Sequence, residues 1–182
     1  MAPNPLCVDL DRTLIKEDIL IEDLLKVVLK KPQKLPFAFL WLLFGKSFLK
    51  YNLAKIYPPD PARLTYNESV INLVKLRHCK KGKVYLATAS TKSRAESIAN
   101  FLGIFDGVFA SDKNINLKSK KKAEVLSNSF GYKRFDYVGD SRSDFPVWRC
   151  CDQAFILGDN PSLLCRIQKI NLSVISLEKM SS

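Results

Sequence analysis

The chain has 182 residues, of which 47% are apolar, and a formal net charge of +11. This length suits one domain or a core with a modest insertion, and this apolar fraction excludes an intrinsically disordered chain. The positive charge would attract nucleic acid, an anionic membrane surface or phosphorylated substrates. Because the lysines are spread along the sequence and not gathered in one aromatic-rich stripe, we expect a generally basic surface and no nucleic-acid partner.

The five cysteines are odd in number and include no C-x-x-C pair. The sequence therefore predicts neither a disulfide framework nor a zinc site, and it favours a reducing compartment. The first residues show no basic start followed by an uninterrupted apolar stretch, so we see no signal peptide. These features predict a cytoplasmic location.

Apolar residues recur with two different periods along the chain. Short apolar runs predict β-strands at residues 6–10, 84–87, 108–110, 135–138, 154–157 and 172–175. Helical spacing predicts α-helices at residues 16–31, 67–78, 93–102, 123–130 and 162–167. This alternation predicts an α/β fold, a Rossmann-like three-layer α/β/α parallel sheet with right-handed crossovers. Residues 16–66 interrupt it, so we expect a core made of residues 1–15 and 67–182 and an inserted helical cap made of residues 16–66.

Residues 35–44 form the most apolar stretch of the chain. A bilayer span needs about 20 apolar residues, and this run is half as long. We interpret it first as a buried helix of the core or cap. Aromatic residues and two lysines continue to residue 51, so the alternative is a peripheral membrane contact through residues 35–51.

Two acidic pairs follow apolar runs at opposite ends of the chain. Asp9 and Asp11 stand at the end of the first predicted strand, after the apolar residues 6–8, and Asp140 and Asp144 follow the run that ends at residue 138. Side chains two residues apart in a strand point the same way, and parallel sheets bind ligands at the carboxyl ends of their strands. Adjacent carboxylates repel, so they require a cation or a shared proton. The alternative is a pair of loop aspartates that cap the next helix.

The order of these motifs, D-x-D-x-T, a strand ending in Thr, a lysine and then G-D-x-x-x-D, resembles the haloacid dehalogenase (HAD) superfamily of aspartyl-phosphate enzymes. The resemblance implies that Asp9 is the nucleophile and that Asp11 is the general acid and base, with Thr13 bracing the turn. Arg12 stands where this family often has glycine, and it either points to solvent or contacts the substrate.

The same resemblance implies a phosphate-binding hydroxyl and a lysine. Thr88 follows the strand predicted at residues 84–87, and Ser90 is a second candidate; alone, a Thr in this position is more often a helix cap. Lys118 and Lys122 are both candidates for the lysine that neutralises the nucleophile and the phosphate. We prefer Lys122 because apolar residues follow it at helical spacing.

The resemblance also implies a magnesium site. Asp9, the backbone carbonyl of Asp11 and Asp140 would supply hard oxygen ligands, which Mg²⁺ prefers. Asp144 would lie behind them and orient either Lys122 or a water on the metal.

The stretches PLCVDLDRTL, YLATAST, NLK and FDYVGDSRSDFPVW, with the apolar run at residues 37–44, are similar to the HAD-like domain associated with UbiA-type membrane prenyltransferases. This similarity implies a small-molecule phosphate ester, prenyl-linked or a sugar phosphate, as substrate. We therefore predict a Mg²⁺-dependent phosphatase that acts through an aspartyl-phosphate on Asp9. The alternatives are a phosphotransferase with the same site and a catalytically silent module that binds a membrane surface or a prenyltransferase.

Overall fold

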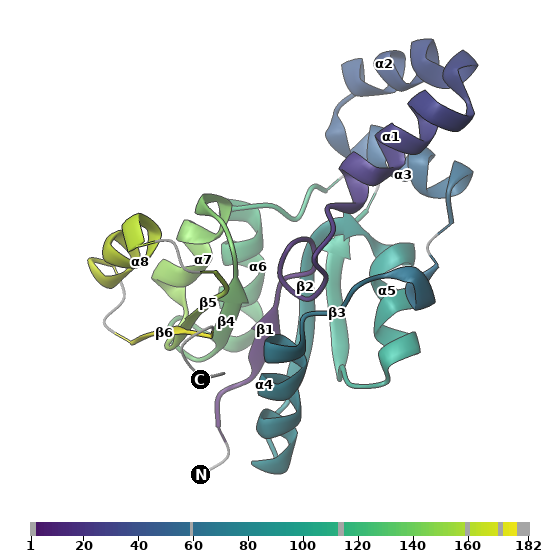
Figure 1. Ribbon diagram of the computed structural model, residues 1–182. Helices are drawn as coiled ribbons and strands as arrows, with labels where there is room; N and C mark the ends of the chain where they lie inside the picture. Colours follow the sequence, from purple (N-terminus) through teal and green to yellow (C-terminus); the bar gives the residue numbers. More distant parts are fainter. Residues whose placement is uncertain (1–2, 59, 113–114, 159–160, 171–172, 178–182) are drawn as a thin grey trace.

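The computed structural model describes residues 3–58, 60–112, 115–158, 161–170 and 173–177. Six strands form one sheet in the order β3-β2-β1-β4-β5-β6, and every neighbouring pair is parallel (Figure 1). The strands are β1 (Leu6–Val8), β2 (Val84–Thr91), β3 (Gly107–Ser111), β4 (Asp136–Gly139), β5 (Ala154–Ile156) and β6 (Val174–Ser176). The predicted α/β fold with a parallel sheet is confirmed.

Helices cover both faces of the sheet and complete three layers. One face packs on α4 (Glu68–Cys79) and α5 (Lys92–Leu102). The other packs on α6 (Lys120–Phe130), α7 (Phe145–Cys150) and α8 (Pro161–Gln168). Successive strand residues alternate between these two apolar cores, as the pleat of a strand requires: Val138 faces the first core and Tyr137 the second.

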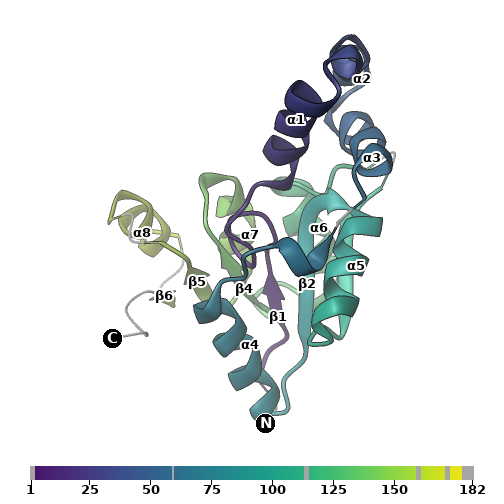
Figure 2. The same cartoon turned by 45° about the vertical axis from the view of Figure 1, so that its right-hand side comes forward.

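The insertion after β1 folds as three helices that stand above the carboxyl ends of the strands (Figure 2). They are α1 (Ile19–Lys30), α2 (Leu35–Leu43) and α3 (Lys46–Ile56), with 3₁₀ turns at Pro32–Lys34 and Pro61–Arg63. We call residues 19–56 the cap. Its small core contains Val27, Ala38, Leu49 and Leu53. The division into residues 16–66 and the remainder stays a prediction.

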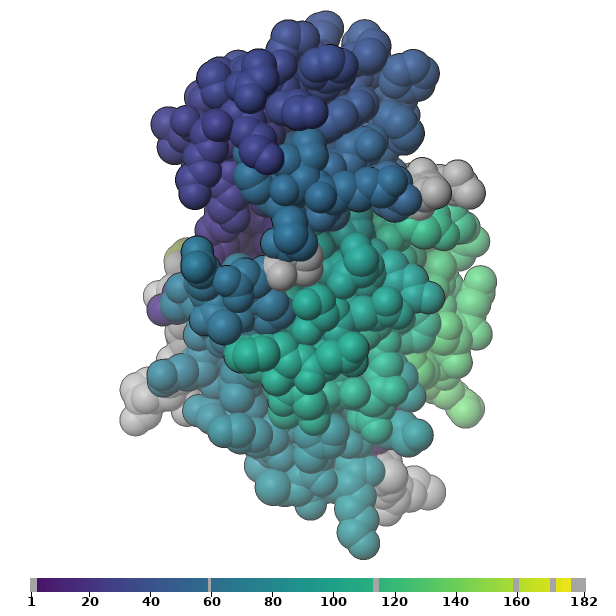
Figure 3. Space-filling view, turned by 90° about the vertical axis from the view of Figure 1, so that its right-hand side faces the viewer, coloured from purple at the N-terminus to yellow at the C-terminus, as the bar shows by residue number. Residues whose placement is uncertain are grey.

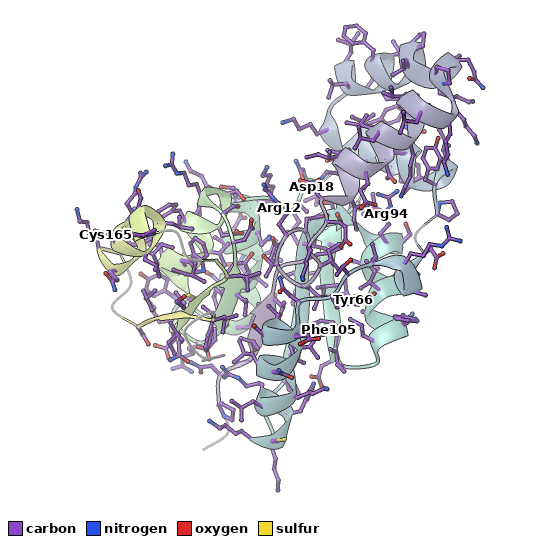
Figure 4. All side chains as sticks on the ribbon, in the orientation of Figure 1. Arg12, Asp18, Tyr66, Arg94, Phe105 and Cys165 are labelled. Atoms are coloured by element: carbon purple, nitrogen blue, oxygen red, sulfur yellow. The ribbon has the colours of Figure 1, made fainter. Side chains whose placement is uncertain are left out.

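Polar contacts from α1 and α3 join the cap to the core. Asp23 of α1 and Arg94 of α5 form a buried ion pair, and Arg94 also donates to the Tyr57 carbonyl over 3.0 Å. Figure 4 shows Arg94 at the base of the cap. On the opposite side, Lys50 of α3 donates to the Ala89 carbonyl on β2 over 2.8 Å. These bonds fix the cap over the carboxyl ends of the strands.

Several sequence expectations need correction. β2 continues to Thr91, so Thr88 and Ser90 lie inside the strand and not after it. Residues 35–43 form a cap helix, α2, as one of the interpretations predicted, but the predicted burial is wrong, because only Ala38 of α2 is buried. Helix α7 was not predicted. The last predicted strand began at residue 172, which lies outside the described residues; the part that is described, β6, starts at Val174.

Candidate active site

The loop after β1 holds both carboxylates of the first motif at the carboxyl end of the sheet. Asp9 continues the sheet hydrogen bonding by donating its N–H to the Val138 carbonyl over 3.0 Å. Asp11 is then held from two sides: its Oδ1 accepts from the Ile19 N–H at 3.0 Å, and its Oδ2 accepts from the Ser90 hydroxyl at 2.8 Å. These bonds fix the position of the Asp11 carboxylate relative to Asp9.

Arg12, in the turn between these aspartates and α1, has an unusual backbone conformation. Arg12 has φ of 59°, in the left-handed region that favours glycine, which is the residue that the HAD pattern often has here. Its guanidinium Nε lies 3.6 Å from Asp140 Oδ2 and 3.9 Å from Asp18 Oδ2. Figure 4 shows Arg12 and Asp18 side by side beneath the cap. Thr13 is fully buried, but its hydroxyl has no hydrogen-bond partner among the described residues, so the predicted bracing role is not observed.

Lys122 is the lysine that reaches the nucleophile candidate. Its Nζ lies 2.6 Å from Asp9 Oδ1 and 3.6 Å from Asp144 Oδ1, and its side chain is buried. Burial raises the pKa of Asp9 to about 7, with the Lys122 charge opposing that rise and the Asp144 charge adding to it. For Lys122, burial acts against the charge, but Asp9 and Asp144 outweigh it and raise the pKa. Lys118 is exposed at the rim of the same cavity.

Tyr137 completes this buried network and was not predicted from the sequence. Its hydroxyl accepts from Lys122 Nζ at 2.8 Å and donates to Asp144 Oδ1 at 2.8 Å, and the residue is fully buried. Asp144 also accepts from the Ser141 N–H and hydroxyl, both at 3.3 Å. A tyrosine three residues before the aspartate of G-D, within an apolar strand, is the sequence signal that could have indicated this contact, because a buried tyrosine hydroxyl usually has a partner.

Three carboxylates are close enough to hold one cation. One oxygen from each of Asp9, Asp140 and Asp144 lies within 4.8 Å of the others. Burial, and then the neighbouring Asp144 charge, raises the pKa of Asp140, because both disfavour the charged form of its carboxyl group. Such a set of hard oxygens fits Mg²⁺. Asp144 thus lies both beside Lys122, as expected, and within ligand reach.

The two predicted phosphate-binding hydroxyls are engaged within the protein. Thr88 is fully buried, and its Oγ1 accepts from the Ser90 N–H at 2.9 Å. Ser90 donates its hydroxyl to Asp11, as described above. Between them in the strand, the half-buried Ala89 lines the site cavity, whereas neither hydroxyl residue does so. The geometry therefore brings Ser90 to the general-acid candidate more directly than to a phosphate.

The cavity over Asp9 is small, about 130 Å³, and is lined by both the core and the cap. The cap contributes Leu20, Lys46 and Lys50, and burial lowers the pKa of the Lys50 ammonium. No residue of the segment 35–44 lines this cavity. The apolar helix α2 therefore does not shape the site directly.

Known proteins resemble the chain in sequence and in fold to different degrees. No family model matches the chain. A curated protein of Sinorhizobium fredii (strain NBRC 101917 / NGR234), described as uncharacterized protein y4nM, is 35% identical over 178 residues, which is 98% of this chain and 34% of that protein. The chain thus spans about a third of the length of the curated relative it matches.

Solved structures resemble the whole chain at low identity. A substrate-bound phosphoserine phosphatase is 18% identical, with 99% of this chain and 97% of that one covered and a TM-score of 0.65. A protein of unknown function from Bordetella pertussis Tohama I is 14% identical, with 97% and 100% covered and a TM-score of 0.68. A HAD family hydrolase from Salmonella enterica subsp. enterica serovar Typhi is 13% identical, with 96% and 68% covered and a TM-score of 0.66. The chain has the fold of the HAD-family hydrolases.

Proposed function

We propose that the chain is a Mg²⁺-dependent phosphatase that hydrolyses phosphoric monoesters through an aspartyl-phosphate on Asp9. The observation that carries this proposal is the contact of the buried Lys122 with Asp9, beside Asp140 and Asp144 at the carboxyl end of the sheet. One solved structure of this fold is described as a phospho-aspartyl intermediate analogue of phosphoserine phosphatase, which supports the same chemistry.

The chain's own residues would act in two steps. In the first, an Asp9 carboxylate oxygen attacks phosphorus, the bond from phosphorus to the ester oxygen breaks, and Asp11 gives its proton to that oxygen. In the second, Asp11 takes a proton from water, whose oxygen attacks the phosphorus and releases Asp9 and inorganic phosphate. The Ser90 and Ile19 bonds to Asp11 hold this acid in place for both transfers.

Charge is balanced by groups on two sides of Asp9. Lys122 would neutralise the nucleophile and the incoming phosphate as a point charge. Mg²⁺ held by Asp9, Asp140, Asp144 and the backbone carbonyl of Asp11 would offset negative charge on the transferring phosphoryl group. Burial of the carboxylates makes both contributions larger than they would be in water.

We also propose a small, polar substrate in place of a prenyl-linked one. The cap presents two lysines and a single leucine to the cavity, and the apolar α2 lies away from it. A sugar phosphate fits this lining better than a phosphate joined to a long apolar chain. A cytoplasmic location remains part of the proposal, supported by an odd number of cysteines that include no C-x-x-C pair.

The test is release of inorganic phosphate from an aryl phosphate, with Mg²⁺ or with EDTA. We expect turnover by the unaltered chain with Mg²⁺, and no turnover with EDTA or for Asp9→Asn. Asp152→Asn is the matched control, because that aspartate is exposed and distant from the cavity lining, and it should keep full activity. Substantial activity of Asp9→Asn would exclude the aspartyl-phosphate mechanism.

The alternative of a phosphotransferase predicts substrate loss without equal phosphate release once an alcohol acceptor is added. A catalytically silent module predicts no turnover and no covalent phosphate on Asp9 after acid quenching, even if Mg²⁺ binding is detected by calorimetry. These two readouts separate the three functions.

A further inference from the structure

Most of the exposed apolar surface of the molecule lies on the cap. Of the sixteen large hydrophobic side chains that are exposed among the described residues, twelve lie between residues 21 and 48. The other four, Leu76, Phe101, Ile115 and Tyr132, are scattered over the core. Figure 3 shows the cap, in purple to blue, projecting from the core. Scattered apolar residues are normal on a protein surface, but a concentration of this kind indicates a contact.

The exposed side chains lie outside the buried core of the cap, although Phe44 packs on Phe48 at a ring-centroid distance of 5.6 Å. The cap core is filled by Val27, Leu49 and Leu53. By contrast, Phe39 and Phe44 are 66% and 70% exposed, and neither lines the site cavity. Their exposure is therefore left without a role in either the fold or the proposed reaction.

Residues 19–57, which are the cap and Tyr57, carry a strongly positive net charge. Residues 19–57 contain seven lysines and two acids, and both acids are already paired: Glu22 with Lys26, and Asp23 with Arg94. Lys34 immediately precedes α2, and Lys46 lies just beyond its end. The exposed apolar helix is thus bounded by cations at both ends.

We propose that the cap docks on an anionic lipid surface, with α2 lying in the plane of the headgroups. An apolar face bordered by lysines is typical of helices that lie in a membrane interface, where the lysines meet anionic headgroups. Protein–protein interfaces, by contrast, are depleted in lysine. The contact includes the exposed face of α1, for example Leu25 and Leu29, and so extends beyond residues 35–51.

This contact is peripheral. The nine residues of α2 extend about 14 Å at 1.5 Å per residue, whereas the hydrocarbon core of a bilayer is about 30 Å thick. Among the described residues, no helix combines the length and the apolar character that crossing a membrane requires.

The experiment is co-sedimentation of the full chain with vesicles. One set contains phosphatidylcholine with about a third phosphatidylglycerol, an anionic lipid, and the other contains phosphatidylcholine alone. We expect binding to the anionic vesicles, weakened by high salt, and at least about tenfold weaker binding of the double variant Phe39→Ser, Phe44→Ser. Leu76→Ser, at a 45% exposed site on the core, should bind like the unaltered chain.

Three outcomes would overturn the proposal. They are no binding to anionic vesicles, unchanged binding of the double variant, and equal loss in Leu76→Ser. Circular dichroism melting of every variant shows whether loss of binding follows loss of fold. Sedimentation velocity tests the competing occupant: a dimer that the double variant dissociates, without vesicle binding by the unaltered chain, would show that a second copy covers this face.

Discussion

The hydroxyl of Tyr137 offers the most selective test of how the site is held together. Tyr137→Phe removes one oxygen atom and keeps the ring, which packs edge-on against Trp148 at a centroid distance of 6.4 Å. The change takes an acceptor from Lys122 and a donor from Asp144. Lys122 keeps its 2.6 Å contact with Asp9, and Asp144 keeps Ser141, so neither charge loses all of its partners.

The expected loss follows from those two bonds. A hydrogen bond to a charged group is worth about 1.5–3 kcal/mol, and the retained partners offset part of the loss, so we expect the free energy of unfolding to fall by about 2–4 kcal/mol. In a chain of this size each kcal/mol lowers Tm by roughly 2–4 °C. Tyr137 does not line the cavity, so KM should change little, whereas kcat should fall about tenfold or more because Lys122 is less firmly placed.

The assay is aryl phosphate hydrolysis with Mg²⁺, well below the Tm of the variant, with kcat and KM determined separately. Tyr85→Phe is the control, since this half-buried tyrosine packs on Phe109 and Phe130 and its hydroxyl forms no hydrogen bond that the described residues show. A drop in Tm with unchanged kcat would show that Tyr137 is merely structural. No change in either quantity would refute the network as an energetic unit.

Two further predictions concern other charged groups. Lys122→Met should lower activity about a hundredfold or more and lower Tm, because it leaves Asp9 beside other buried acids without the lysine charge. Lys118→Met, at the exposed rim of the cavity, should keep Tm. The reverse ranking of activities would contradict the assignment of Lys122. For Asp136, burial raises the pKa above 3.8 despite Arg77 at 2.7 Å, so the folded chain binds more protons than the unfolded chain just above pH 3.8. Urea titrations give the free energy of unfolding of the unaltered chain and of Asp136→Asn. The value for the unaltered chain minus the value for the variant should therefore fall as pH rises through the raised pKa and then stay constant. A difference that grows with pH would show that the ion pair outweighs burial.

The sequence was sufficient to bring distant acids together because topology does most of that work. Asp9 and Asp140 are 131 positions apart, yet β1 and β4 are adjacent and parallel, so the residues that follow them meet at one edge. In the structure, β2 pairs with β1 on its other side, also in parallel. The order of the motifs along the chain, and the resemblance that this order carries, predicted this part of the site.

The choice between Lys118 and Lys122 depended on a helix start that the pattern did not show. The predicted helix began at residue 123, whereas α6 begins at Lys120, after Ser119 at φ of 53°. With the first turn included, Lys122 lies within the helix beside the buried Ala123 and points to Asp9, while Lys118 stays in the loop. Several consecutive lysines hide this boundary, because they have similar helix propensities and charges.

The error on residues 35–44 has a different physical origin. A helix that is apolar on all sides is usually interpreted as buried, because its sequence gives no face to solvent. Whether it can be buried depends on how much protein surrounds it, and a cap of three short helices encloses only Ala38 of α2. Trp41 is half-buried against the cap core, and the other side chains of α2 are exposed. The apolar run is long enough to form a helix, but whether the surface of that helix is buried depends on the size of the unit that carries it. The three-helix cap is too small to bury it.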